Sequence, residues 1–276
     1  VGAGPGSLAR SVLAARPRCG PALRYVLVEP SAAQRAQPAA HLPLAPAGAA
    51  LAPAPAGPSV VSVAEPPDEL DAAVVLANEL LDNLPFGLLE RGPEGWNEVR
   101  VGLEGGSLTE VLVPAEIEPV GSAATGAPVG ARVPTQRAAA EWVGRARSLA
   151  APAGRVLVFD YASSTAEMAA RPWRGWARPY RHHAPGGHPL VQVGQQDVTC
   201  EVAVDQLPTP SADWSQADWL RAHGIDDLVA EGRATWQRRA AVGDLEAVRG
   251  RSRVIEAEAL LDADGLGASR VLEWRP

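Results

Sequence analysis

The chain has 276 residues, a net charge of -7 at pH 7 and no lysine, so all 25 of its basic residues are arginine. The acidic balance disfavours a chain-wide surface for nucleic acid or anionic membranes, and the missing lysine excludes a Walker phosphate loop and a pyridoxal Schiff base. Only Cys19 and Cys200 occur, outside any CxxC pair, which argues against a disulfide scaffold, a zinc ribbon or a thioredoxin-type centre.

The first thirty residues combine a glycine turn, a helical pattern and a strand. Gly2, Gly4 and Gly6 give GxGxG in "VGAGPGSLAR", and a helical pattern follows over 7–16. The run 23–31, "LRYVLVEPS", is β-rich and reaches Glu29 just before a proline. This order is typical of half of a nucleotide-binding βαβ unit.

Two buried strands are predicted after a proline-alanine segment. Residues 38–58 contain too many prolines for a regular helix, and we interpret them as a surface linker. The runs 59–63 and 71–79 are nearly continuous apolar stretches, which are typical of strands in a sheet covered on both faces. The sheet is therefore predicted to be mostly parallel.

The second half alternates between helical, extended and irregular patterns. The turns "GPEG" and "EGGS" predict a β-hairpin or meander over 86–114, and 163–212 lack a clear period, as expected of a functional lid or insertion. The remaining predicted elements are a helix at 135–150, a strand at 154–162, helices at 215–223 and 226–241, and a terminal antiparallel hairpin formed by 252–261 and 268–274.

The glycines alone are compatible with a tight strand-to-helix turn that binds nothing. The dinucleotide fingerprint GxGxxG requires a third glycine where Ser7 stands, so nicotinamide and flavin cofactors are disfavoured. Glu29, at the end of the second strand, is placed to accept hydrogen bonds from both hydroxyls of a ribose. An adenosine-containing ligand without a pyrophosphate satisfies both observations, and S-adenosylmethionine is the commonest such ligand.

Seven segments occur in an order that resembles a known family: "VGAGPGSLAR", "YVLVEPS", "ANELLDNLPF", "GWNEVRV", "GRVLVFDYA", "GQQDVTCEV" and "SQADWLRAHGI". The chain is similar to the MidA-like family of class I S-adenosylmethionine-dependent methyltransferases, which includes the mitochondrial protein arginine methyltransferase that assists assembly of respiratory complex I. The resemblance implies an α/β, Rossmann-like class I fold with a seven-stranded, mostly parallel sheet, an antiparallel terminal hairpin and an inserted substrate-recognition region. It also implies S-adenosyl-L-methionine as cofactor, no metal, and a protein arginine as methyl acceptor.

The resemblance also predicts a domain organisation. Residues 1–162 would form the cofactor-binding core with the hairpin insertion at 86–114, 163–212 the insertion or lid, and 213–276 the C-terminal part of the core. The family has a helical N-terminal region and the first half of the first strand before the position of Val1. Without that central strand its neighbours lose their pairing, so we expect a truncated chain or a misplaced start.

The segment "ANELLDNLPF" supplies the candidate catalytic residues Asn78, Glu79 and Asp82. They follow a predicted strand, at the edge of the sheet where open α/β folds bind ligands. If the chain turns helical after Glu79, residues 79 and 82 share one face and can grip a guanidinium or the cofactor's ammonium, while Asn78 contacts the cofactor and accepts from the target nitrogen. The alternative is that Asn78 and Glu79 cap the helix and Asp82 is solvated.

Four further residues are candidates for substrate binding. Asp160 and Tyr161 end the strand at 154–162 and are expected to line the acceptor pocket, although a tyrosine buried against the sheet is an equal alternative. Asp197 and Thr199, together with Gln196, are expected near the acceptor channel, and the alternative is a hydrogen-bonded cluster that fixes the loop.

Other conspicuous residues have simpler interpretations. The histidines have no metal-binding partners and are interpreted as loop residues. The tryptophans are interpreted as packing residues, and the alternative is an apolar groove for a partner protein. The arginine run is interpreted as solvated charge, and the alternative is docking of an acidic partner. These residues are His182, His183 and His188; Trp173, Trp176, Trp214 and Trp219; and Arg171, Arg174, Arg178 and Arg181.

Four functional interpretations remain open after the sequence. The first is a methyltransferase acting on a protein arginine, with a respiratory-complex subunit as the partner. The second is a small-molecule methyltransferase, and the third is a cofactor-binding assembly factor without catalysis. The fourth is a Rossmann-type oxidoreductase, which Ser7 disfavours. No apolar run approaches the roughly 18 residues of a membrane-spanning helix, so we predict a cytoplasmic protein without a membrane or nucleic-acid partner.

Overall fold

The computed structural model describes residues 2–46, 48, 57–68, 70, 73–116, 119, 126–182 and 184–275. The chain divides into two compact units. The first unit comprises Val1–Leu80, Arg145–Val156 and Arg275–Pro276, and the second comprises Leu81–Gly144 and Leu157–Trp274.

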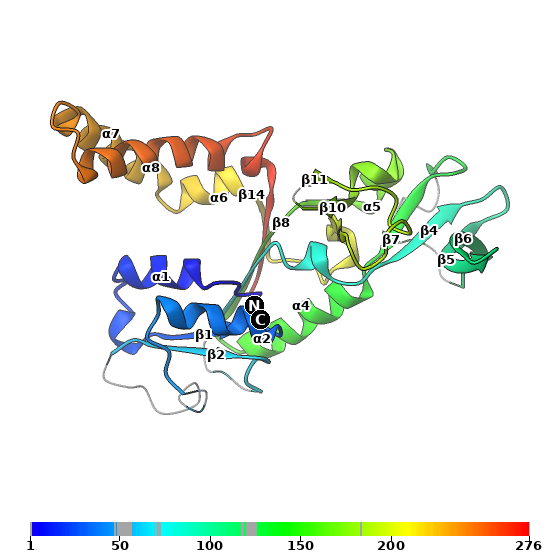
Figure 1. The fold of residues 1–276 in the computed structure, drawn as a ribbon, viewed down its shortest axis with the longest axis horizontal. Helices are drawn as coiled ribbons and strands as arrows, with labels where there is room; N and C mark the ends of the chain where they lie inside the picture. Colours follow the sequence, from blue (N-terminus) through cyan, green and yellow to red (C-terminus); the bar gives the residue numbers. More distant parts are fainter. Residues whose placement is uncertain are drawn as a thin grey trace. The chain divides into compact units, whose positions relative to one another are not determined.

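The first unit is built on a parallel strand pair. Its elements are α1 (Ser7–Ala14), η1 (Gly20–Ala22), β1 (Arg24–Val28), α2 (Ala32–Ala36), η2 (Gln37–Ala40), β2 (Ser59–Val63) and β3 (Val74–Asn78). β1 and β2 pair in parallel from Arg24 opposite Ser59 to Val28 opposite Val63. Ala9, Leu27, Leu42 and Val60 form one buried core cluster. The elements α1, α2, β1 and β2 lie together at the blue end of the chain (Figure 1). The three predicted strands and the first helix are thus confirmed.

Part of the proline-alanine segment belongs to this core, so its interpretation as a surface linker is wrong for residues 38–45. Pro38 is buried in η2, and Leu42 is only 6% exposed. Leu44 forms a parallel bridge with Val60. The prolines do prevent a regular helix, but the leucines between them still bury their side chains beside β2. Residues 47 and 49–56 lie outside the described residues.

The second unit contains most of the remaining elements. Those that precede residue 165 are η4 (Leu81–Asn83), β4 (Gly87–Arg91), β5 (Trp96–Glu104), β6 (Ser107–Pro114), β7 (Arg132–Thr135), α4 (Arg137–Ala150), β8 (Arg155–Asp160) and β9 (Ala162–Ser163). Those that follow are α5 (Thr165–Ala169), η5 (Trp173–Gly175), β10 (Ala177–Arg181), β11 (Ala184–Pro185), β12 (Asp197–Cys200), β13 (Val202–Ala203), η6 (Val204–Gln206), β14 (Ala212–Ser215), α6 (Gln216–Ala222), α7 (Ile225–Arg239), α8 (Leu245–Leu261), η7 (Leu266–Ala268) and β15 (Arg270–Trp274). The last residues of α4 and the first of β8 belong to the first unit.

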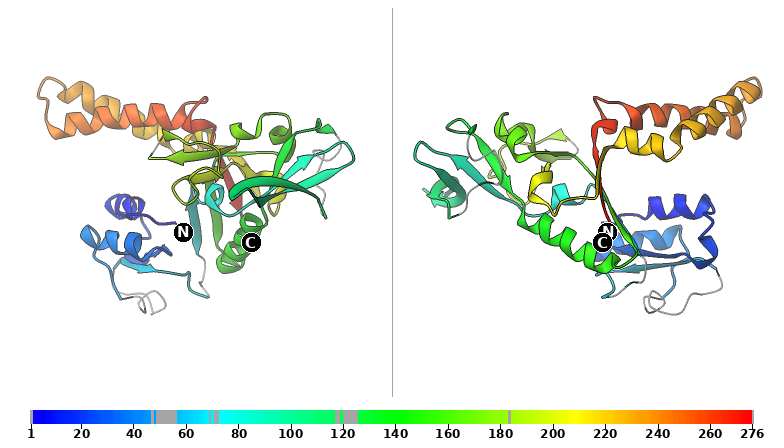
Figure 2. Two further views of the ribbon diagram at one scale, coloured as in Figure 1. Left: turned by 45° about the vertical axis from the view of Figure 1, so that its right-hand side comes forward. Right: turned by 180° about the vertical axis from the view of Figure 1, so that it is seen from behind.

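The predicted meander is confirmed as an antiparallel sheet. Its strand order is β6-β5-β4-β7, and β5 and β6 form a long hairpin (Figure 2). Gly105 and Gly106 have φ of 56° and 83° at the tip of this hairpin. Two central residues with positive φ make the tight turn whose twist matches that of the flanking strands.

The predicted terminal hairpin is wrong in its first half. Residues 252–261 belong to α8, which lies beside α7 (Figure 1). Asp244 caps α8 by accepting a hydrogen bond from the Ala247 N–H at 3.0 Å. A Cβ at Gly250 would lie 2.8 Å from the Gly232 O, so the two glycines allow α7 and α8 to approach closely. The second half is a strand, β15, which pairs antiparallel with β14.

The expected seven-stranded, mostly parallel sheet is not confirmed. Among the described residues the largest sheets have four strands. β1 pairs with β2 and β9 with β13 in parallel, whereas β14 and β15 and the meander strands are antiparallel. The short turns within the meander can join only antiparallel strands. Parallel and antiparallel pairs therefore occur in the same chain, and the fold is a mixed α/β one.

Within the described ranges, none of the helices combines the length and the apolar composition that crossing a bilayer requires.

Candidate functional site

The glycine turn at the start of the first unit is left-handed at every second residue. Gly2, Gly4 and Gly6 have φ of 65°, 49° and 77°, a region that disfavours residues with a Cβ. Gly6 is the N-cap of α1, whose start receives no side-chain cap. A Cβ at Gly4 would meet no atom within 4 Å. Backbone conformation therefore accounts for all three glycines, and Gly4 in addition borders open space.

Glu29 lies directly against this turn. It follows β1 and is 8% exposed. Its Oε2 accepts the Gly4 N–H at 3.4 Å, and its Oε1 accepts the Ser31 N–H at 3.0 Å. A carboxylate offers about four acceptor positions, so the two oxygens retain capacity for hydroxyl donors. The turn and the acid, predicted from separate stretches of sequence, meet in one place.

Asn78 and Glu79 lie at the end of β3, in the same unit. Both are exposed, and a Cβ at Gly2 would lie 3.2 Å from Leu80 Cδ1, so this corner of the chain adjoins the glycine turn. Glu79 has a φ of 47°, outside any helix, and the helical turn that follows is the short η4. The expectation that residues 79 and 82 share one helical face is therefore wrong.

Asp82 and Asp160 form a buried acidic pair in the second unit. They are 5% and 2% exposed, so the alternative of a solvated Asp82 is wrong. Asp160 Oδ2 accepts the N–H groups of Leu81 at 2.9 Å and Asp82 at 3.4 Å, and Oδ1 accepts that of Tyr161 at 2.9 Å. Burial, followed by the charge of Asp82, raises the pKa of Asp160 to about 8 despite these bonds. Asp160 thus fixes the turn of η4, and its role toward a substrate stays a prediction.

Tyr161 follows this pair. Its side chain is 37% exposed, so the alternative of a tyrosine buried against the sheet is wrong. A contact with the methyl acceptor stays a prediction.

Sequence reasoning missed a buried polar centre around Gln136. This residue is 3% exposed, its Nε2 donates to Glu201 O at 2.9 Å, and its Oε1 accepts the Ala203 N–H at 2.6 Å. Cys200 Sγ lies 3.4 Å from the same Nε2, and burial raises the pKa of the Cys200 thiol. The only sequence signal was a glutamine in the first turn of the helix predicted at 135–150.

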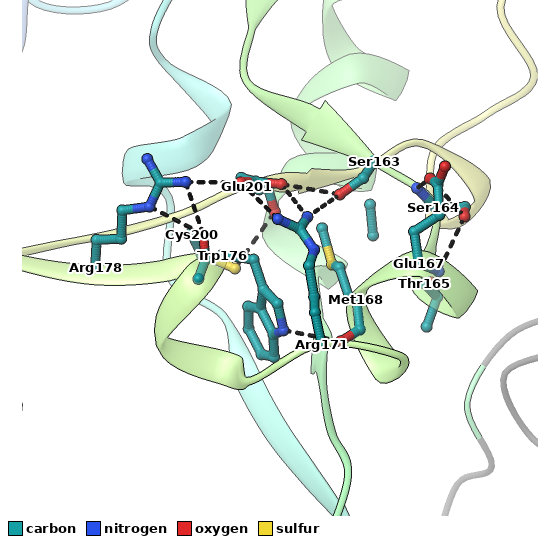
Figure 3. Close-up of polar contacts among 12 residues, drawn as sticks. Ser163, Ser164, Thr165, Glu167, Met168, Arg171, Trp176, Arg178, Cys200 and Glu201 are labelled. Atoms are coloured by element: carbon teal, nitrogen blue, oxygen red, sulfur yellow. Dashed lines mark hydrogen bonds and ion pairs between the residues drawn. The ribbon is translucent and has the colours of Figure 1, made fainter. Parts of the chain in front are cut away.

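The sequence analysis also did not single out Glu201, which organises the arginine run (Figure 3). Its side chain is 13% exposed and pairs with Arg171 at 2.5 Å and Arg178 at 3.1 Å, while the Ser163 hydroxyl donates to Oε2 at 2.9 Å. Arg171 and Arg178 are therefore ion-paired with a partly buried carboxylate and not simply solvated, although the Arg178 side chain stays exposed. The cluster joins β9, the segment after α5, β10 and the residue after β12 within the second unit.

Gln196 fixes a loop, as the alternative interpretation held. Its Oε1 accepts the Gly187 N–H at 2.9 Å, and its Nε2 donates to His188 O at 3.2 Å. Asp197 is exposed and Thr199 partly buried. Their proximity to an acceptor channel stays a prediction.

The predictions for the histidines and tryptophans are confirmed for some of these residues and not for others. His188 Nε2 lies 3.3 Å from Glu110 Oε1, and His183 lies outside the described residues. No group of three or more metal-ligating side chains occurs in the part of the chain that the structure describes. Trp176 is buried and donates to Met168 O at 3.1 Å, as expected of a packing residue, whereas Trp214 is 41% exposed.

Comparison with known proteins identifies a family that matches most of the chain and two solved structures with a similar fold. Residues 1–222 match a family described as "Putative S-adenosyl-L-methionine-dependent methyltransferase". A crystal structure of a "likely methyl transferase" from Burkholderia thailandensis, bound to S-adenosyl-homocysteine, has 25% identity and a TM-score of 0.73, covering 99% of this chain and 69% of that chain. A native structure of a protein of the same superfamily from that organism has 24% identity and a TM-score of 0.71, covering 99% and 71%. No curated protein matches the chain.

Proposed function

Because the chain belongs to this family of S-adenosyl-L-methionine-dependent methyltransferases, we propose that it transfers the methyl group of S-adenosyl-L-methionine to a protein arginine side chain. The observation that carries the proposal is the meeting of Gly4 and Glu29, within the matched residues, at the end of β1. The relative with 25% identity is bound to S-adenosyl-homocysteine, the demethylated form of this cofactor.

The residues of the first unit fit the cofactor by the chemistry of their donors and acceptors. The Glu29 carboxylate has unused acceptor positions for ribose hydroxyls, and Gly4 leaves the space that a side chain would occupy. The uncapped N–H groups at the start of α1 favour a carboxylate. When bound, the cofactor supplies an electrophilic methyl group on a sulfonium. No metal is needed for this chemistry.

The proposed contribution of the chain to transfer is positioning and charge. An arginine guanidinium is protonated in water, so a carboxylate is needed to orient its planar fork and to favour loss of its proton. Glu79 is exposed at the end of β3, beside the glycine turn, and is proposed for this role. Asn78, the preceding residue, is proposed to accept a hydrogen bond from the target nitrogen through its side-chain oxygen.

The direct test uses the full chain, cofactor labelled in its methyl group, and peptides that contain either arginine or citrulline at one position. We expect label in the arginine peptide alone, recovered as methylarginine after acid hydrolysis. The Glu79→Gln variant is expected to bind the cofactor and transfer no label. Label found only in small molecules would contradict the arginine acceptor, and cofactor binding without any product would favour the non-catalytic assembly factor.

A pair of glycine substitutions separates a binding turn from a merely tight turn. Gly4→Ala and Gly105→Ala both place a Cβ in open space at φ of 49° and 56°. Each is expected to lower the free energy of unfolding by about 1–2 kcal/mol through left-handed strain. Only Gly4→Ala is expected to weaken S-adenosyl-homocysteine binding, by about tenfold in calorimetry. Equal affinities in the two variants would show that Gly4 serves the turn alone.

A further inference from the structure

We propose that a cleft in the second unit binds an extended peptide segment through a basic side chain. The cleft has a volume of about 680 Å³ and lies between the meander sheet and the start of α4. This volume is within the range of ligand-binding pockets and exceeds that of a single side chain. The binding does not require the cofactor and is separate from the proposed methyl transfer.

The floor of the cleft is one face of the meander. Leu89 on β4 stands opposite Glu98 on β5, so both side chains lie on the same face. Gly87, two residues before Leu89, shares this face and stands opposite Thr135; a Cβ there would lie 2.4 Å from Thr135 Oγ1. The missing side chain at Gly87 therefore makes room for the Thr135 side chain, which lines the cleft beside it. Phe86, at the same end of β4, adds an apolar surface.

The charges that line the cleft are mainly negative. Glu98, Glu116 and Glu141 line it, against the single arginine Arg137. Glu98 is paired with Arg100 at 2.7 Å. Within the described ranges the carboxylates of Glu116 and Glu141 make no hydrogen bond or ion pair. Glu116 follows β6 and Glu141 lies on α4, so two available carboxylates come from separate elements around one cavity.

The combination of charge and apolar surface defines the ligand. Negative groups that line a cleft with low-dielectric walls attract cations more strongly than the same groups on a flat surface. Phe86, which is partly exposed, and the exposed Pro85 offer apolar contact to the residues that flank the cation. A peptide with a basic residue between apolar residues matches both features, whereas a free organic cation would use only the carboxylates.

The experiment measures binding of acetyl-Leu-Arg-Leu-amide to the full chain without cofactor, by calorimetry at low and at moderate salt. The double variant Glu116→Gln, Glu141→Gln is expected to weaken binding at least tenfold. The matched control, Glu94→Gln with Glu104→Gln, removes the same charge from exposed hairpin residues outside the cleft and is expected to leave binding within twofold. Higher salt is expected to weaken binding.

Two further peptides and agmatine complete the test. The lysine peptide is expected to bind and the citrulline peptide to fail, since the carboxylates recognise charge. Agmatine, which has the guanidinium without the apolar flanks, is expected to bind at least tenfold more weakly than the peptide. No binding of the arginine peptide, equal binding of the citrulline peptide or of agmatine, or unchanged binding by the Glu116 and Glu141 double variant would overturn the proposal. A failure here leaves cofactor binding and methyl transfer as separately measured properties.

Discussion

Replacing Glu29 by alanine is expected to weaken S-adenosyl-L-methionine binding about 100-fold, as measured by calorimetry. The carboxylate is proposed to accept two ribose hydroxyls, and charge-assisted hydrogen bonds contribute about 1.5–3 kcal/mol each. Two such bonds at the lower figure give about 3 kcal/mol, and each 1.4 kcal/mol corresponds to a factor of ten. The substitution also removes the acceptor of the Gly4 and Ser31 N–H groups, so the turn itself loses support.

Two further variants separate the effect of the lost Glu29 charge from the effect of its lost hydrogen bonds to the turn. Glu29→Gln keeps one acceptor oxygen and is expected to weaken binding by a smaller factor than alanine does. Glu65→Ala removes an exposed carboxylate from the same unit and is expected to leave affinity unchanged. An affinity unchanged in Glu29→Ala would remove this residue from the cofactor site and would leave the glycine turn without its acidic partner.

The second large effect is a loss of stability with rising pH, caused by Asp160. In the unfolded chain this carboxyl has its ordinary pKa of 3.8, and in the folded chain its pKa is about 8. Between these two pH values Asp160 is protonated in the folded chain and ionised in the unfolded chain. The contribution of Asp160 to the stability of the folded state is therefore complete below pH 3.8 and decreases as the pH rises toward 8. We expect the contribution of Asp160 to the free energy of unfolding to fall by up to about 1.4 kcal/mol per pH unit in this window. Urea denaturation at pH 5, 6, 7 and 8 measures it.

Variants of the acidic pair test this assignment. Asp160→Asn is expected to flatten the pH dependence and to cost about 1–3 kcal/mol at low pH, because an amide cannot accept bonds at both former oxygens. Asp82→Asn removes the neighbouring charge and is expected to shift the loss of stability to lower pH while making it smaller. Asp227→Asn, at an exposed position on α7, is the control and should follow the unmodified chain. A pH dependence that persists in Asp160→Asn would assign it to other groups.

Local patterns predicted those parts of the fold that local chemistry determines. The strand at 59–63 and the helix start at Ser215, which accepts from the Asp218 N–H, are as expected, because apolar runs and side-chain caps act over a few residues. The apolar residues of 252–261 follow neither the helix period nor the strand period clearly, so the sequence predicts a strand where the structure has part of α8. Its close packing against α7 through Gly232 and Gly250 involves residues 18 positions apart and leaves no local signal.

The candidate site, too, has features that can be predicted from short stretches of sequence and features that depend on tertiary packing. From short stretches of sequence it can be predicted that Gly2, Gly4 and Gly6 precede a helix and that Glu29 follows the next strand, because these features involve neighbouring residues only. Only the tertiary structure brought Gly4 to Glu29, buried Asp160 beside Asp82, and placed Glu201 between Arg171 and Arg178. Burial and long-range pairing decide which carboxylates are charged, bonded or available, and they arise only when distant segments pack together.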